Sequence, residues 1–356
     1  MLSLQSGYAL RPLLCHTRHF STSSPFSNAL KVAFFGSDEF SIQSLRRLHE
    51  ASKQSPGLIS HIDLIAKHPK ATGRDLKTIS DVPIVSFAQD NHINVIRAES
   101  TSEINDLVAN NYTMAIAVSY GKLIPKKFLS AIPYSLNVHP SLLPRYSGAS
   151  PLQFALLNHD THTGVTVQTL HPTEFDRGEI VAQTPEIPIA ADETITSLRD
   201  RLAVEGAKLL VQVVQDGSYK DPQLSSKYEY SYASKITPQM AEIDWGKSTR
   251  DIIRQYNTLG PLHTFKEIKI KKRRKPLVHE WRRVILSDIS YAKGIEDKQP
   301  GEFELGGDQI IIKTSDGAIA AKYLQLEFEK KEEAMKFWSG LPKKAGDTPY
   351  VFTQKQ

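Results

Sequence analysis

The sequence has one cysteine, no long apolar run and no acidic residue before Asp38. With Cys15 as the lone thiol, the chain cannot form an internal disulfide or a zinc site built from several cysteines. No stretch of about 18 apolar residues occurs, so no segment is predicted to span a membrane. Hydrophobic residues make up 40% of the chain and charged residues 23%, which is typical of folded globular proteins.

The segment before Asp38 combines Arg11, Arg18 and a run of hydroxyl residues at 21–24. Leaders that contain arginine and serine but lack acidic residues are typical of mitochondrial transit peptides. We therefore predict a transit peptide over residues 1–29 and a location in the mitochondrial matrix. A tail without targeting information is the alternative. A secretory signal is disfavoured because the segment has no uninterrupted apolar core.

The length of the chain, 356 residues, predicts more than one domain. We expect a first domain over residues 30–217 and a linker over 218–234, where serine, tyrosine and lysine are frequent. A second domain is expected over residues 235–345. The formal net charge is +5 and the sequence pI is about 9.0, which is weak evidence for an anionic partner.

Short apolar segments alternate with helix-like segments across the first domain. Strands are predicted at 31–35, 62–66, 84–85, 114–119, 136–138, 163–170 and 180–187. Helices are predicted from about residue 40, at 101–109, at 151–158 and at 192–216. The expected caps are Ser37 for the first helix and Asp192 for the last, with Gly217 ending the last one. This alternation predicts an α/β fold with a parallel, Rossmann-like sheet. No G-x-G-x-x-G follows the first strand, which argues against a dinucleotide site.

The second domain has a different pattern. A helix is predicted at 248–259, and strands are predicted at 309–314 and 318–326, separated by turns that contain glycine. Short strands joined by tight turns predict a small β-barrel of the OB type.

The segment Ser135–Ser150 reads SLNVHPSLLPRYSGAS and places Asn137 and His139 two residues apart. On an extended strand, side chains at this spacing point to the same side. An amide donor and an imidazole on one side can stabilise a developing oxyanion. The prolines that follow stiffen the next loop, so that residues 141–144 can form a rigid wall for a flat ligand.

A second polar segment, HPTEFDRGEI, carries carboxylates at Glu174, Asp176 and Glu179. A carboxylate that faced His139 would orient the ring and favour the imidazolium form. Turn acids and histidines near strand ends more often serve as caps or turn formers. The spacing of these residues alone therefore does not decide whether they form an active site.

The ordered motifs N-V-H-P-S-L-L-P-R, G-A-S-P, T-G-V-T-V and F-D-R-G-E-I resemble the signature of folate-dependent formyltransferases. The resemblance implies that Asn137, His139 and Asp176 are catalytic. It also implies that 10-formyltetrahydrofolate is the formyl donor and that no metal takes part. The residues implied to bind the folate are Ser141, Leu142, Leu143, Pro144, Tyr120, Gly121 and Ile124.

Two features resemble methionyl-tRNA formyltransferases of the mitochondrial type: a motif that follows the first domain, and a basic loop at 68–83. The motif Y-A-x-K-I at 232–236, followed by I-D-W at 243–245, resembles the start of their C-terminal domain. The resemblance implies that residues 30–217 form the catalytic domain and that the barrel binds initiator methionyl-tRNA. The implied tRNA contacts are Lys70 and Arg74 in a basic loop, and Lys271, Lys272, Arg273 and Arg274 in a basic cluster. No protein partner and no membrane contact are expected.

Three alternatives stay open at this point. Formyltransferases that act on glycinamide ribonucleotide resemble the first domain in the same motifs, and so do hydrolases of formyl-folate. A non-catalytic RNA-binding protein on a formyltransferase scaffold is the alternative from another class. Separately from these alternatives, an ordinary solvated surface is the other interpretation of each basic segment.

Overall fold

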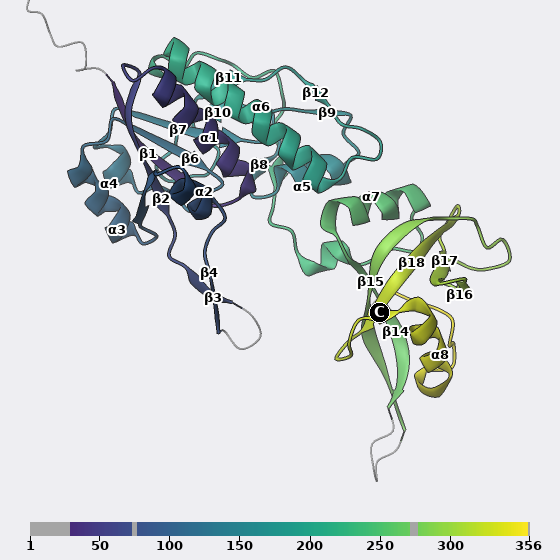
Figure 1. Cartoon of the computed structure of the whole chain (residues 1–356). Coiled ribbons are helices and arrows are strands. Elements are labelled where there is room, and N and C mark those ends of the chain that lie inside the picture. The colour runs from purple at the N-terminus through teal and green to yellow at the C-terminus, as the bar shows by residue number, and fades with distance from the viewer. Residues whose placement is uncertain (1–28, 73–76, 271–276, 355–356) are drawn as a thin grey trace, which may run out of the picture.

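The computed structural model describes residues 29–72, 77–270 and 277–354 (Figure 1). These residues fold around three large hydrophobic cores, two in the N-terminal part and one in the C-terminal part, and a small cluster of Tyr146, Ala155 and Ala233. The predicted transit peptide lies outside the described residues, apart from its last position. No helix among the described residues combines the length and the apolar character needed to cross a membrane.

The N-terminal part contains a seven-stranded sheet with the order β11-β10-β7-β6-β1-β2-β5. Its parallel strands are β1 (Leu30–Gly36), β2 (Ile59–Ala66), β5 (Asn94–Arg97), β6 (Met114–Val118) and β7 (Tyr134–His139). Two antiparallel strands, β10 (Thr166–Gln168) and β11 (Ile180–Gln183), extend the sheet beyond β7. The predicted Rossmann-like sheet is therefore confirmed.

Both faces of this sheet are covered by helices, which explains why the central strands β1 and β6 are buried at nearly every position. Val32 and Phe34 of β1 join a core that includes α1 (Glu39–Gln54) and α6 (Ile195–Asp216). The alternate residues Ala33 and Phe35 join the opposite core. That second core includes side chains of α3 (Thr101–Asp106), η1 (Leu107–Asn110) and α4 (Lys126–Leu129).

The ends of the long helices correct two predicted caps. Asp38, and not Ser37, caps α1, because its side chain accepts a hydrogen bond of 3.0 Å from the Ser41 N–H. Thr194, and not Asp192, caps α6 through a reciprocal capping box with Ser197. The predicted end of this helix is confirmed: Gly217 has a φ of 77°, the left-handed conformation that glycine adopts without strain.

The strand predicted at 84–85 is wrong, because these residues begin the helix α2 (Ile84–Asp90). Ile84, Val85 and Ala88 are buried at helical spacing, and a two-residue apolar pair does not distinguish the two periods. The strands predicted at 163–170 and 180–187 are each interrupted. They form β9 (His162–Thr163), β10, β11 and β12 (Ile187–Pro188).

Short elements complete the N-terminal part. They are the hairpin strands β3 (Lys70–Thr72) and β4 (Thr78–Ser80), the helix α5 (Pro151–Leu157) and the turn η2 (Ser218–Lys220). The two-residue strand β8 (Ser147–Gly148) pairs in parallel with β13 (Tyr232–Ala233). The segment predicted as a linker is thereby attached to the loop that follows β7.

The C-terminal part is a curled antiparallel sheet with the order β14-β15-β18-β17-β16, and β19 pairs with β18. The strands are β14 (Leu262–Ile270), β15 (Val278–Ala292), β16 (Phe303–Gly306), β17 (Gln309–Lys313), β18 (Ala318–Leu326) and β19 (Glu332–Glu333). The helical elements are η3 (Pro238–Ala241), α7 (Thr249–Leu259) and α8 (Ala334–Lys344). Residues near the C-terminus form bridges to both edges, with Thr353 opposite Phe265 and Val351 opposite Glu302. These bridges give the sheet the barrel-like closure expected from the sequence.

The two parts meet where α5 lies beside α7 (Figure 1). His159 Nε2 lies 3.0 Å from Asp251 Oδ1, an ion pair between the N-terminal part and α7 when the imidazole is protonated. Together with the pairing of β8 and β13, this contact joins the C-terminal part to the segment that carries Asn137 and His139.

Candidate active site

Asn137, His139 and Asp176 come together at the carboxyl end of β7. β10 runs antiparallel to β7, with Gln168 opposite Asn137 and Thr166 opposite His139. Beyond β10, a loop returns the chain toward β7 and places Asp176 Oδ1 3.3 Å from His139 Nδ1. Asp176 has a φ of 54°, a left-handed conformation that aspartate tolerates better than most residues.

The imidazole of His139 has an acceptor at each ring nitrogen. Its Nε2 lies 2.9 Å from the main-chain oxygen of Tyr146, and its Nδ1 faces the Asp176 carboxylate. Only the imidazolium form has an N–H on both nitrogens, so it alone satisfies both acceptors. The ring is also buried, with 7% of its side chain exposed. This arrangement fixes the orientation of the ring, and in its imidazolium form the ring would place a positive charge beside Asp176.

Asp176 receives hydrogen bonds on both carboxylate oxygens. The Gly148 N–H donates to Oδ2 at 2.8 Å, and the Gln168 amide donates to Oδ1 at 3.3 Å. Burial of the carboxyl group acts to raise its pKa. The hydrogen bond and charge of His139, with the Gly148 and Gln168 donors, outweigh that effect and lower the pKa of Asp176 below its ordinary value. Asp176 is therefore ionised at neutral pH.

Asn137 lies two residues before His139 on β7, on the same side of the strand. The residue is half-buried. Within the part of the chain that the structure describes, its side chain has no hydrogen-bond partner. An amide donor is thus available beside the His139–Asp176 pair.

Sequence reasoning missed Gln168, which lies beside Asn137 and donates to Asp176. The residue is 1% exposed, and its Oε1 has no hydrogen-bond partner among the described residues. A buried amide with one unused acceptor is uncommon and points to a role at the site. Gln168 could have been found by pairing β10 antiparallel with β7, because that register places it opposite Asn137.

The predicted folate-binding loop 141–144 is rigid and largely turned inward. Leu142 and Leu143 are 4% and 1% exposed, so contact with a ligand at these positions would be made mainly by the main chain. The loop is held by hydrogen bonds from Leu143 N to Thr166 Oγ1 at 3.0 Å and from Ser141 Oγ to Arg145 O at 2.6 Å. Pro144 O accepts a bond of 3.3 Å from Ser231 N.

The second predicted folate segment follows β6, the strand that pairs with β7. Tyr120 and Ile124 are buried, and the Tyr120 hydroxyl donates to the main-chain oxygen of Ala98. Gly121, between them, is exposed and has a φ of 71°. A Cβ at Gly121 would approach only the Lys67 ammonium, at 3.3 Å, so the main chain here is open to a ligand.

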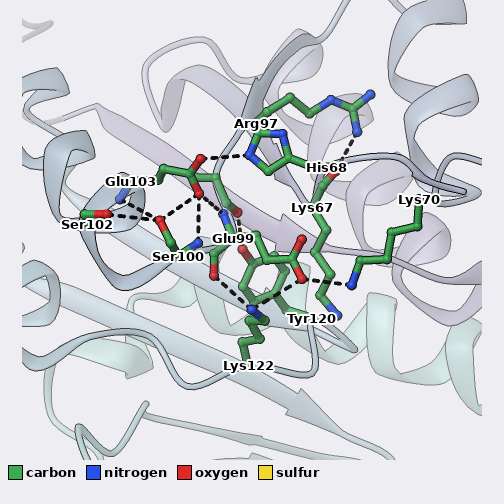
Figure 2. Close-up of polar contacts among 11 residues, drawn as sticks. Lys67, His68, Lys70, Arg97, Glu99, Ser100, Ser102, Glu103, Tyr120 and Lys122 are labelled. Atoms are coloured by element: carbon green, nitrogen blue, oxygen red, sulfur yellow. Dashed lines mark hydrogen bonds and ion pairs between the residues drawn. The ribbon is translucent and has the colours of Figure 1, made fainter.

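Figure 2 shows a polar cluster at this edge of the sheet, which sequence reasoning did not identify. The ammonium groups of Lys70 and Lys122 lie 3.0 and 3.3 Å from Glu99 Oε1. Lys67 lies over the Tyr120 ring, and burial lowers the pKa of its ammonium group despite the nearby charge of Glu99. Lys67 directly follows β2, and the carboxyl end of a parallel strand is the position at which ligands of such sheets gather.

Of the predicted tRNA contacts, Lys70 is the one that the structure describes. Its side chain is 67% exposed and its charge is partly neutralised by Glu99. Arg74, Lys271, Lys272, Arg273 and Arg274 lie outside the described residues. The hairpins that lead to these positions, β3–β4 and β14–β15, both extend toward the bottom of the view in Figure 1.

Comparison with known sequences matches both parts of the chain. Residues 30–214 match the family model "Formyl transferase", and residues 235–342 match "Formyl transferase, C-terminal domain". The chain is 34% identical to the mitochondrial methionyl-tRNA formyltransferase of Saccharomyces cerevisiae, over 94% of this chain and 95% of that protein. It is 30% identical to the methionyl-tRNA formyltransferase of a Sulfurihydrogenibium species, over 89% of this chain and 99% of that protein.

Solved structures share the fold at low sequence identity. HypX from Aquifex aeolicus, in complex with tetrahydrofolic acid, aligns with a TM-score of 0.56 and 14% identity over 88% of this chain. This chain spans 47% of the length of HypX. An N-formyltransferase from Helicobacter canadensis, in complex with folinic acid and dTDP-3-aminofucose, aligns with a TM-score of 0.52 and 18% identity. That alignment covers 82% of this chain and 98% of the other.

Proposed function

Because the chain belongs to the methionyl-tRNA formyltransferase family, we propose that it formylates the α-amino group of initiator methionyl-tRNA with 10-formyltetrahydrofolate. The observation that supports this reaction most directly is the buried pair of His139 and Asp176 beside the free amide of Asn137. The pair and the amide supply a cation, a carboxylate and a hydrogen-bond donor at one strand end. Acyl transfer to an amine uses these three groups.

The proposed reaction is a direct acyl transfer. When bound, 10-formyltetrahydrofolate supplies the formyl carbonyl that the methionyl amine attacks. The Asn137 amide donates a hydrogen bond to the formyl oxygen, on which negative charge accumulates. Because both nitrogens of His139 already face acceptors, the ring acts as a fixed positive charge at the same strand end.

Asp176 has two roles in this proposal. As the new C–N bond forms, the amine loses a proton and the leaving nitrogen of the folate gains one. A carboxylate with a lowered pKa is a weak base, so the main role of Asp176 is to keep His139 charged. Its second role is to relay the proton, which ends on the leaving nitrogen, so that the carboxylate is ionised again after the transfer.

The segments proposed to hold the folate fit a flat ring ligand. Gly121 leaves an open approach to the main chain, and Leu123, two residues later, is 38% exposed. Residues 141–144 directly follow β7 and are held rigidly against Thr166 of β10. We propose that Tyr120, Gly121, Ile124 and residues 141–144 line the folate site mainly through their main chain.

The division of the chain and its location form part of the proposal. We propose a transit peptide at 1–29, a catalytic domain at 30–217, a linker at 218–234 and a tRNA-binding domain at 235–345. The acid-poor leader and the mitochondrial yeast relative support delivery to the mitochondrial matrix. Fusion of residues 1–30 to a fluorescent reporter tests this, and cytosolic fluorescence would contradict it.

The reaction is tested with purified protein and 10-formyltetrahydrofolate. Methionyl-tRNA, glycinamide ribonucleotide and no acceptor are supplied in separate incubations. We expect formylmethionyl-tRNA in the first and no product in the other two. Formylation of the ribonucleotide, or release of formate without an acceptor, would support the purine-pathway or hydrolase alternative instead. Binding of tRNA without any formyl transfer would support the non-catalytic alternative.

A further inference from the structure

Exposed aromatic side chains in the N-terminal part gather around Asp176. Among the described residues from 29 to 233, the exposed aromatic side chains are Phe175, Tyr230 and Tyr232, with exposed fractions of 54%, 50% and 62%. The other aromatic side chains in this part of the described structure are buried or half-buried. Three exposed rings at one place, next to a buried ion pair, indicate a binding surface.

The segment with the two tyrosines is held firmly against the loop that follows β7. Ser231 forms three hydrogen bonds with this loop. Two join main chains, from Ser231 N to Pro144 O at 3.3 Å and from Ser147 N to Ser231 O at 2.9 Å, and in the third Tyr146 N donates to the Ser231 side-chain Oγ at 2.9 Å. The parallel pair of β8 and β13 continues the attachment. Tyr230 and Tyr232 are therefore fixed in position, although their rings are exposed.

The rings and one guanidinium group surround the acid. The Tyr232 ring lies 2.8 Å from the position that a Cβ on Gly148 would occupy, and the Gly148 N–H donates to Asp176. Phe175 precedes Asp176 and Arg177 follows it. The Arg177 guanidinium lies 4.5 Å from the centre of the Tyr230 ring. We refer to Phe175, Arg177, Tyr230 and Tyr232 as the aromatic rim.

We propose that the aromatic rim stacks the unpaired nucleobases at the 3′ end of the acceptor tRNA, and the terminal adenine above all. The proposal rests on the function proposed above. In methionyl-tRNA the reacting amine belongs to an ester on the ribose of the terminal nucleotide. The terminal base is thus a few bonds from the amine, and it must lie beside Asp176 when the amine is in place.

The chemistry of the rim fits single-stranded nucleic acid. Exposed aromatic rings stack on any base, and an arginine contributes both a cation for phosphate and a flat face for stacking. Arg177 also has an acidic neighbour, Glu174, whose Oε2 lies 3.8 Å from its Nε. Both of these side chains are exposed, so solvent screens their attraction and the guanidinium stays free to contact a nucleotide.

The test uses the full-length protein and initiator tRNA in which 2-aminopurine replaces the terminal adenine. Stacking quenches the fluorescence of this base. Each tyrosine is changed to leucine, which removes the ring, and to phenylalanine, which keeps it. Tyr291→Leu, in the C-terminal part, serves as a matched control because Tyr291 is also exposed, at 63%. Binding of the tRNA is followed separately by anisotropy of a label far from its 3′ end.

We expect brighter emission from the bound base with Tyr230→Leu and Tyr232→Leu than with the wild type. The two phenylalanine variants and Tyr291→Leu should match the wild type. With methionyl-tRNA as substrate, kcat/KM should fall by roughly 5- to 150-fold in each rim leucine variant, the range expected for one lost base stack. Thermal unfolding of the variants identifies any loss of folding, and Phe175→Leu tests the rim at a position outside the paired strands.

The outcomes separate this proposal from the proposed function. If the wild type formylates methionyl-tRNA but the leucine variants show unchanged emission and unchanged kcat/KM, the rim proposal is wrong and the function stands. If the wild type binds the tRNA but does not formylate it, the proposed function is wrong, while a difference in emission between leucine and phenylalanine variants would still support stacking. If leucine and phenylalanine variants lose activity equally, the hydroxyl groups matter and base stacking is refuted.

Discussion

Replacement of Asp176 by asparagine removes one charge from the buried pair and keeps the shape of the side chain. In the wild type, the carboxylate lies 3.3 Å from the imidazole, and two unit charges at that distance attract by about 5 kcal/mol at an effective dielectric constant of about 20. In the variant, the new amide oxygen can still accept from Gly148 N–H, which turns the amide NH2 toward His139. The ring nitrogen facing it must then accept a hydrogen bond, so His139 becomes neutral.

The expected loss follows from this change of charge. Part of the attraction offsets the cost of burying both ions, so removal of one partner should cost roughly 3–5 kcal/mol. We expect kcat to fall by about 10²–10⁴, because each tenfold change corresponds to about 1.4 kcal/mol. The KM for tRNA should stay nearly constant, since the exposed fraction of the Asp176 side chain is only 9%.

The assay is the initial rate of methionyl-tRNA formylation at saturating formyl donor. Glu179→Gln is the matched control, because Glu179 is an exposed acid of the same loop. We expect this control to keep wild-type turnover. A turnover of Asp176→Asn within about tenfold of the wild type would refute the reasoning, since the loss of a 3.3 Å ion pair would then have no catalytic cost.

Three further predictions test other parts of the account. Asn137→Ala should lower kcat by about 10²–10³ in the same assay, the usual loss for one oxyanion donor; a near-normal rate would show that Asn137 has another role. Gln168→Met removes a donor that lowers the pKa of Asp176, so the acid limb of the kcat–pH profile should move to higher pH; an unmoved limb would count against Gln168 as a positioning residue. Burial lowers the pKa of the Lys266 ammonium to about 8, while the unfolded chain keeps its proton up to about pH 10.5, so stability should rise as pH increases between these values. Lys266→Met should abolish that rise. It should also increase the free energy of unfolding at neutral pH by about 1–2 kcal/mol, after the loss of the hydrogen bond to Thr348 O is subtracted. Urea unfolding at several pH values measures both effects, and an unchanged pH dependence would contradict a lowered pKa of Lys266.

The sequence predicted those parts of the fold in which local pattern and tertiary burial agree. The apolar run of β1 reads as a strand buried on both faces, and the alternation of Val32 and Phe34 with Ala33 and Phe35 between two cores confirms it. The helix α6 was predictable because its apolar spacing extends over many turns and ends at Gly217. The strand predicted at 84–85 was wrong because two apolar residues are too few to show whether the apolar pattern repeats as in a strand or as in a helix.

The two strands of the β14–β15 hairpin were not predicted, for two physical reasons. Its strands alternate apolar residues with charged ones such as Lys266, which the structure buries, so the expected polar face is partly interior. A basic cluster also separates the two strands in the sequence, and its composition reads as a surface loop. Burial of Lys266 depends on a contact with Thr348, 82 positions away, which no local pattern reveals.

The candidate site shows the same limit. Asn137 and His139 are close in sequence, and the resemblance to formyltransferases supplied Asp176. The contact of Gln168 with Asp176 depends on the register of β7 against β10, which the composition of either strand does not determine. The position of Tyr232 over Gly148 depends on a strand pair whose members are 84–86 residues apart in the chain, as β13 covers 232–233 and β8 covers 147–148.

The most direct test of the central claim follows the formyl carbon itself. The purified protein is incubated with 10-formyltetrahydrofolate labelled with ¹³C in the formyl group and with methionyl-tRNA, and the methionine is then released by hydrolysis of the ester and examined by mass spectrometry. We predict ¹³C-labelled N-formylmethionine with the wild type, and a product yield lower by orders of magnitude with Asn137→Ala and Asp176→Asn. Unlabelled methionine from the wild type, or equal labelling by all three proteins, would contradict formyl transfer by these side chains.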